Sequence, residues 1–132
     1  MNELAPENYG LGVAREFRAR HFLFGGDWGA ENQPHEHAYR VEVILNGPEL
    51  DSHGYLTDIA LLENLLEDLA GRFAGKLLND LPEFAGLNPS LEHFCRIWWE
   101  ELAESLPLAG LSELAVKMWE NDIAWASYAR EL

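Results

Sequence analysis

Cysteine, basic residues and long apolar runs are scarce in this chain of 132 residues. The single cysteine, Cys95, has no intramolecular disulfide partner, which favours a reducing compartment. Only 9 residues are Lys or Arg against 23 Asp or Glu, and the formal net charge of −14 repels nucleic acid and anionic membranes. No apolar run approaches the roughly 20 residues that span a bilayer, and the first residues form neither a basic nor an apolar leader segment. We therefore expect a cytoplasmic protein whose partners include neither nucleic acid nor a membrane.

Apolar residues, in contrast, make up 48% of the sequence. At this length they can form one hydrophobic core, so we expect a single domain over residues 1–132. Five tryptophans and many other large apolar side chains are more than a thin subunit can readily bury. We therefore also expect copies of the chain to associate through the edges or faces of a sheet.

Two segments near the N-terminus alternate apolar and polar residues at the period of a β-strand. In residues 12–24 one face carries apolar side chains together with His21, and in residues 37–45 one face carries Tyr39 and three aliphatic side chains. His35 and His37 begin the second segment on that same face. Residues 25–34 are Gly-rich and polar, which predicts a loop. We expect the two strands to pair.

The middle of the chain changes to helical periodicity. Leucines recur at helical spacing from Leu62 onward, behind Thr57 or Asp58 as the N-cap, and a second such run follows Ser90. Residues 79–89 separate the two helices. Alternation returns in two C-terminal runs, so the element order is strand, strand, helix, helix, strand, strand. This order predicts an α+β fold in which both helices cover one face of an antiparallel four-stranded sheet.

Three histidines are placed to share one metal ion. His35 and His37 are two residues apart on a strand, which puts their Cβ atoms about 6–7 Å apart on one face. His21 lies on the core-facing side of the strand that we expect to pair with theirs. Three neutral imidazoles leave a tetrahedral zinc ion with one open position, as in catalytic sites. Histidines at this spacing also occur by chance, so the spacing alone leaves an ordinary hydrogen-bonded role open.

Six short motifs occur in order between residue 17 and about residue 128. They are FRARH at 17–21, HEH at 35–37, GYLTD at 54–58, LLND at 77–80, NPSLE at 88–92 and the EN of VKMWEN near 120. Together they resemble the motifs F-x-A-x-H, H-G-H, G-M-V-x-D, L-N-D, N-P-T-x-E and a VWET-like strand of the 6-pyruvoyl- and 6-carboxy-tetrahydropterin synthase family. The resemblance covers nearly the whole chain.

The resemblance implies a tunnelling fold, in which subunits join their sheets into barrels that stack, commonly into a homohexamer (a dimer of trimers). It assigns zinc ligation to His21, His35 and His37, in agreement with their spacing. It also implies that Glu120 anchors a pterin, whose amidine-like edge presents two N–H donors that one carboxylate can accept. The implied activity is that of a lyase acting on the side chain of a dihydropterin such as dihydroneopterin triphosphate.

The chain departs from the family at two catalytic elements. The family's general base is a cysteine four residues before the first histidine of H-G-H, where this chain has Glu31. The family's Asp-His pair precedes L-N-D, where the alignment places Ala74 and Gly75. Family members with glutamate at the position of Glu31 are associated with cleaving the pterin side chain to leave a hydroxymethyl group.

Three hypotheses follow from these residues. In the first, Glu31 replaces the thiolate as the base of a zinc-dependent pterin lyase. In the second, catalysis is lost and the protein is a module that binds zinc and a pterin or purine. In the third, the histidines only join two strands of an assembly subunit.

Overall fold

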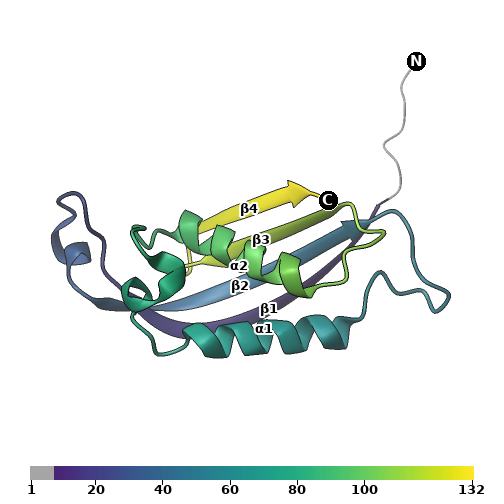
Figure 1. Cartoon of the computed structure of the whole chain (residues 1–132), viewed down its shortest axis with the longest axis horizontal. Coiled ribbons are helices and arrows are strands. Elements are labelled where there is room, and N and C mark those ends of the chain that lie inside the picture. The colour runs from purple at the N-terminus through teal and green to yellow at the C-terminus, as the bar shows by residue number, and fades with distance from the viewer. Residues whose placement is uncertain (1–7) are drawn as a thin grey trace, which may run out of the picture.

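The computed structural model describes residues 8–132, and its main elements follow the order that the sequence predicts. They are the strands β1 (Tyr9–His21) and β2 (His35–Gly47), the helices α1 (Ile59–Phe73) and α2 (Leu91–Ser105), and the strands β3 (Glu113–Trp119) and β4 (Trp125–Glu131). Both helices lie on the same face of the sheet (Figure 1). The predicted α+β arrangement is therefore confirmed.

The strands form one antiparallel sheet in the order β1-β2-β3-β4. The register of β1 and β2 pairs His21 with His35 and Ala19 with His37. β3 pairs only with the part of β2 from Arg40 to Asn46. At the end of the sheet that carries the histidines, the paired strands are therefore β1 and β2 alone.

The ends of the first strand pair differ from the sequence-based prediction. The alternating pattern predicts a strand that continues to residue 24, but β1 ends at His21. Beyond it, the N–H of Phe22 donates to Oδ1 of Asn79 and its carbonyl accepts from Nδ2 of Asn79, both at 2.9 Å. Because this side-chain amide takes the place of a neighbouring strand, the backbone is satisfied and the chain can turn into the loop. β2 starts at His35.

Polar side chains cap both helices. Of the two candidates for the first helix, Asp58 is the N-cap, since its carboxylate accepts from two backbone N–H groups of the first turn. Ser90 caps α2, as predicted, since its hydroxyl accepts from the N–H of His93. The segment between the helices contains two short 3-10 turns, Leu78–Asp80 and Pro82–Phe84. Within residues 8–132, none of the helices has the length and apolar character to cross a membrane.

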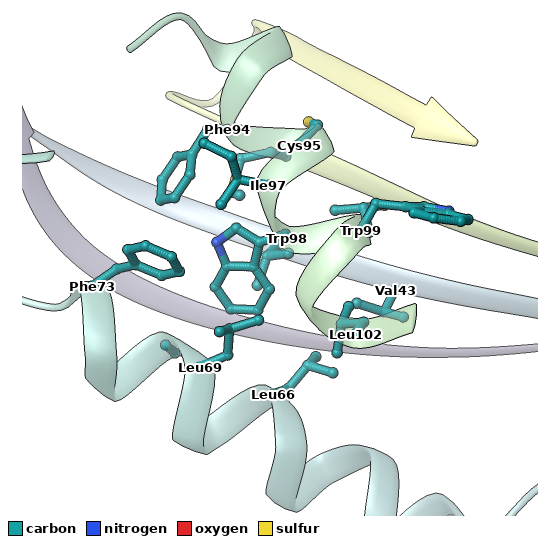
Figure 2. Packing of buried hydrophobic residues seen from close by; sticks show 14 of the residues in the cluster. Val43, Leu66, Leu69, Phe73, Phe94, Cys95, Ile97, Trp98, Trp99 and Leu102 are labelled. Atoms are coloured by element: carbon teal, nitrogen blue, oxygen red, sulfur yellow. The ribbon is translucent and has the colours of Figure 1, made fainter. Parts of the chain in front are cut away.

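An aromatic cluster fills the space between the helices and the sheet. Trp98 of α2 is fully buried, and its ring lies 5.6, 5.8 and 6.5 Å from the rings of Phe17, Phe73 and Phe94. Figure 2 shows Phe73 and the leucines of α1 facing Trp98 across the gap between the helices. Burying one large apolar side chain contributes about 1.5–3 kcal/mol, so this cluster is a major source of stability.

Tyr39 connects the aromatic cluster to the histidines. Its ring stacks on Phe17 at 5.4 Å and meets Phe94 edge-on at 5.2 Å. Its hydroxyl lies 3.4 Å from Nδ1 of His21. Burial raises the pKa of Tyr39, so the phenol stays neutral. At the histidine end of the sheet, the imidazoles are therefore next to tightly packed aromatic rings.

Candidate metal centre

Three imidazoles from the paired ends of β1 and β2 point toward one another. Nε2 of His35 lies 3.0 Å from Nε2 of His21 and 3.0 Å from Nε2 of His37. The cross-strand pairing of His21 with His35, and the two-residue step to His37, produce this convergence. The fold thus brings together the three histidines that the sequence selects.

Backbone carbonyls orient two of the rings. Nδ1 of His21 donates to the carbonyl of Pro89 at 2.9 Å, and Nδ1 of His35 donates to the carbonyl of Gln33 at 2.8 Å. Since a carbonyl only accepts, each neutral ring carries its hydrogen on Nδ1 and directs the lone pair of Nε2 inward. Two lone pairs 3.0 Å apart repel each other unless a cation lies between them. Outer hydrogen bonds of this kind are typical of metal-binding histidines.

Burial keeps the innermost imidazole neutral. His21 is only 3% exposed. Burial lowers the pKa of His21 to about 4; the hydrogen bond to Pro89 acts in the opposite direction, and His37 and His35 lower the pKa further. A neutral imidazole is the form that binds a metal.

A carboxylate joins the histidines from the loop between β1 and β2. A 3-10 turn, Gly29–Asn32, brings Oε2 of Glu31 to 2.9 Å from Nε2 of His35. His21, Glu31, His35 and His37 each offer one atom, and these atoms all lie within 4.8 Å of one another. The sequence predicts three ligands and an open position, whereas the structure has a fourth donor beside the three.

This donor set fits zinc. Imidazole nitrogens and carboxylate oxygens bind zinc at about 2.0–2.2 Å, so ligands around a tetrahedral ion lie roughly 3.3 Å apart. The contacts of 2.9 and 3.0 Å around Nε2 of His35 are close to that separation. A proton on this nitrogen could form a hydrogen bond to only one of the three neighbouring atoms, whereas a metal ion would be bound by all of them.

Glu120 lies next to the cluster, just after β3. Its Oε1 is 3.3 Å from Nε2 of His37, and its N–H donates to the carbonyl of Ala124 at 3.1 Å. Glu120 and His21 also line an open pocket of about 580 Å³, a volume in the range of small-molecule sites. The predicted ring-binding carboxylate and a predicted metal ligand therefore border the same pocket.

The same pocket contains a carboxylate that the predicted site omits. Glu92, in the first turn of α2, lines it together with Glu120. Its position in the NPSLE motif was a signal that could have identified it. His53 and His93, for which the sequence offers no co-ligands, are not in the group of residues within 8–132 that could hold a metal ion.

The segment after α1 has no acid–base pair. Ala74 follows the last residue of the helix, and the N–H of Gly75 donates to the carbonyl of Arg18 at 2.7 Å. Gly75 has a φ of +73°, which favours glycine over any residue with a side chain. This connection attaches the segment to β1, and Ala74 and Gly75 carry no side chain that could act as an acid or a base.

A family comparison matches residues 11–131 to the model of 6-pyruvoyl tetrahydropterin synthase. A 6-carboxy-5,6,7,8-tetrahydropterin synthase of Bacillus subtilis (strain 168) is 31% identical to the chain over 80 residues. These residues are 61% of this chain and 53% of that protein, so the match spans about half the length of the relative.

Solved structures share the architecture. A 6-pyruvoyltetrahydropterin synthase from Plasmodium vivax, with its catalytic glutamate replaced by alanine, matches with a TM-score of 0.81 at 16% identity, over 96% of this chain and 99% of that one. The enzyme from Caenorhabditis elegans matches with a TM-score of 0.79 at 19% identity, over 96% and 98% of the two chains. These matches confirm the predicted tunnelling fold of the subunit. With the family match over residues 11–131, they lead to the conclusion that the chain belongs to the 6-pyruvoyl tetrahydropterin synthase family.

Proposed function

We propose that this protein is a zinc-dependent lyase that acts on the side chain of a dihydropterin, such as dihydroneopterin or its triphosphate. The observation that carries the proposal is the convergence of three imidazole Nε2 atoms beside a pocket lined by Glu120. Membership of the family supports the choice of a pterin as the substrate class.

Each residue of the centre has a defined task in this proposal. His21, His35 and His37 would hold the zinc ion, and bound zinc supplies a Lewis acid that polarises an oxygen of the substrate's side chain. Glu120 accepts two N–H groups from the edge of the ring and so orients the side chain toward the histidines. Glu31, whose side chain is 46% exposed, is the general base.

The reaction that suits these groups is a retro-aldol cleavage. Glu31 takes the proton of a side-chain hydroxyl, the oxygen becomes a carbonyl, and the adjacent carbon–carbon bond breaks. The electron pair of that bond passes to the carbon attached to the ring, where the ring imine delocalises it. Glu31 then returns the proton to this carbon. The products are an aldehyde and a hydroxymethyl pterin, and no oxidant or reductant is consumed.

Product analysis tests the activity. The zinc-loaded protein is incubated with dihydroneopterin and, separately, with dihydroneopterin triphosphate, and the products are identified by mass. The charged side chains that line the pocket, beside His21, are those of Glu92 and Glu120. We therefore expect the substrate without phosphates to react faster, because these carboxylates repel a triphosphate. Finding neither product from either substrate would refute the lyase.

A matched pair of variants tests the base. Glu31→Gln, assayed at a zinc concentration that saturates it, should bind substrate but form no product. Glu36→Gln removes the same charge five residues away, where Glu36 pairs with Arg18 at 2.7 Å on the opposite face of the sheet, and should react normally. Turnover by Glu31→Gln at the wild-type rate would exclude Glu31 as the base.

A non-catalytic module that binds zinc and a pterin or purine is the second candidate. The observation that favours it is the presence of Ala74 and Gly75 where the resemblance expects an Asp-His pair. Acid–base groups typically contribute about 10²- to 10⁴-fold to a rate, so their loss can abolish activity. This candidate predicts that a pterin raises thermal stability without being converted.

We also propose that the protein assembles in the cytoplasm as a homohexamer, a dimer of trimers. In the described part of the chain, β1 and β4 are the outer strands of the sheet and offer edges for pairing with other copies. Native mass spectrometry tests this assembly, because a monomer at micromolar concentration would contradict it.

A further inference from the structure

We propose that Glu31 is the fourth ligand of the metal ion when no substrate is bound, and that its carboxylate withdraws to admit the substrate. This inference rests on the proposed metal centre and extends it. A general base needs no contact with the histidines, whereas a ligand does. One side chain would thus occupy two positions in succession.

The carboxylate of Glu31 is as close to the cluster as the imidazoles are to one another. Oε2 lies 2.9 Å from Nε2 of His35, which itself lies 3.0 Å from each of the other two Nε2 atoms. The neighbouring carboxylate of Glu120 contacts His37 at 3.3 Å but is outside the group of mutually close donors. Within residues 8–132, Glu31 is therefore the carboxylate placed to share an ion with all three histidines.

Hydrogen bonds build the turn that presents Glu31. Its carbonyl accepts from the N–H of Leu23 at 2.8 Å, which ties the turn to the chain leaving β1. The amide of Asn32 accepts from the N–H of Trp28 at 2.8 Å and donates to two carbonyls of the same loop at 2.9 and 3.0 Å. The backbone at Glu31 is therefore held in place, and only its side chain has to move.

Glu31 is also the donor that can leave. Its side chain is 46% exposed, against 24% for His35 and 16% for His37. Carbonyls accept hydrogen bonds from the rings of His21 and His35 on the side away from the cluster, but in the described part of the chain the Glu31 carboxylate has His35 as its one polar partner. Among the four candidate ligands, the Glu31 carboxylate is thus the one that combines high exposure to solvent with a single polar partner.

The chemical consequence is a gated site. A zinc ion with four protein ligands is closed, whereas a catalytic ion keeps one position for water or substrate. Withdrawal of Glu31 would open that position, and the released carboxylate would lie next to the incoming hydroxyl. A carboxylate that has left a cation is also a stronger base than one bound to it. Ligand and base are therefore compatible roles for one residue.

Cobalt substitution tests the inference without any turnover, because the visible spectrum of Co²⁺ reports its ligands. The metal-free wild type, Glu31→Gln, Glu31→Asp and the control Glu36→Gln are titrated with Co²⁺ and with Zn²⁺ against a competing chelator. We expect both Glu31 variants to bind each metal at least ~10-fold more weakly and to give an altered Co²⁺ spectrum. Asp retains the charge but is one methylene shorter, so it separates ligation from simple attraction. Glu36→Gln should match the wild type, and circular dichroism checks that every variant is folded.

The outcomes separate this inference from the proposed function. Equal affinity and an unchanged spectrum in Glu31→Gln would overturn it, as would a wild type that binds neither metal. Dihydroneopterin, with binding verified by equilibrium dialysis, should shift the wild-type Co²⁺ spectrum; a spectrum unchanged in the complex would overturn the withdrawal. If the spectra show ligation by Glu31 and its release but no product ever forms, the lyase activity is refuted and the inference stands.

Discussion

The inward face of the β1–β2 pair has two halves that differ in what stabilises them. In one half Val41, Val43 and Leu45 are fully buried beneath the helices. In the other half His35 and His37 point to the same side of β2. Their Nε2 atoms lie 3.0 Å apart, and Nε2 of His35 is also 3.0 Å from Nε2 of His21. The apolar half is packed without any ligand, whereas three imidazole nitrogens and a carboxylate converge in the histidine half and could hold a cation. We infer that the first determines whether the chain folds and the second determines what the fold binds.

The largest effect that this comparison predicts belongs to the apolar half. Trp98→Ala removes a fully buried indole and leaves a cavity that the rings of Phe17, Phe73 and Phe94 cannot fill. We expect the free energy of unfolding of the metal-free protein to fall by about 3–5 kcal/mol. Urea denaturation followed by circular dichroism measures it.

The control for this substitution is the same residue type at the surface. Trp125 is 51% exposed, so Trp125→Ala should cost less than about 1 kcal/mol, including its contact with Lys117. Losses of equal size in the two variants would mean that the aromatic cluster is not the source of stability.

The second effect belongs to the histidine half and depends on metal. Zinc at a free concentration 100 times its dissociation constant should raise the free energy of unfolding of the wild type by about 2.7 kcal/mol. His35→Ala should abolish this gain, while changing the stability of the metal-free protein by less than about 1 kcal/mol. Thermal denaturation with and without zinc measures both quantities.

His93→Ala is the matched control, because Nδ1 of His93 contacts the carbonyl of Asn88 at 2.8 Å and the ring is not among the donors that could hold a metal ion. It should keep the full response to zinc. If zinc still raised the free energy of unfolding of His35→Ala, the proposed difference between the two halves would be wrong.

Periodicity is sufficient to predict the order of the strands and helices and the convergence of the three histidines, although not the end of β1. Alternation fixes the face to which His21, His35 and His37 point, and antiparallel pairing then brings that face of β1 next to that face of β2. The capping residue Ser90 was also evident, because a cap is a local feature of sequence.

The contacts that sequence reasoning could not supply are those made by side chains across long separations. β1 ends at His21 because the side-chain amide of Asn79, 57 residues from Phe22 in the sequence, hydrogen-bonds to the backbone of Phe22 in place of a neighbouring strand. Glu31 was predicted as a base from a resemblance, but its contact with His35 depends on a 3-10 turn in a loop without periodicity. Neither the turn nor the amide contact produces a periodic pattern in the sequence from which it could be predicted.

A smaller effect on stability, coupled to a specific effect on the centre, is expected at Asn32. Asn32→Ala removes the amide that closes the loop around Glu31. We expect a loss of about 1 kcal/mol in stability and a 10- to 100-fold loss in turnover or metal affinity, as for other outer contacts of a metal site. Chelator competition and the product assay measure them.

The matched control is Asp51→Ala. The carboxylate of Asp51 accepts from the N–H groups of His53 and Tyr55 in the loop after β2, at 2.8 and 3.0 Å. Its removal should cost a similar stability with no change in metal affinity. If Asp51→Ala weakened metal binding as much as Asn32→Ala does, the effect would be general loosening of loops rather than positioning of Glu31.

The smallest expected effect is the absence of a reaction at Cys95 of α2, which belongs to the same hydrophobic core as Val41, Val43 and Leu45. Cys95 is fully buried, and burial raises the pKa of its thiol from 9.0 to about 12. Three pKa units leave roughly a thousandfold less thiolate, the form that reacts with alkylating agents. At pH 8 we therefore expect a neutral alkylating agent to leave the folded protein unmodified and to modify it fully in urea, as mass spectrometry would show. Labelling at the same rate with and without urea would mean that the hydrophobic core around Cys95 opens readily while the protein stays folded, and the two halves would then not differ in the way proposed.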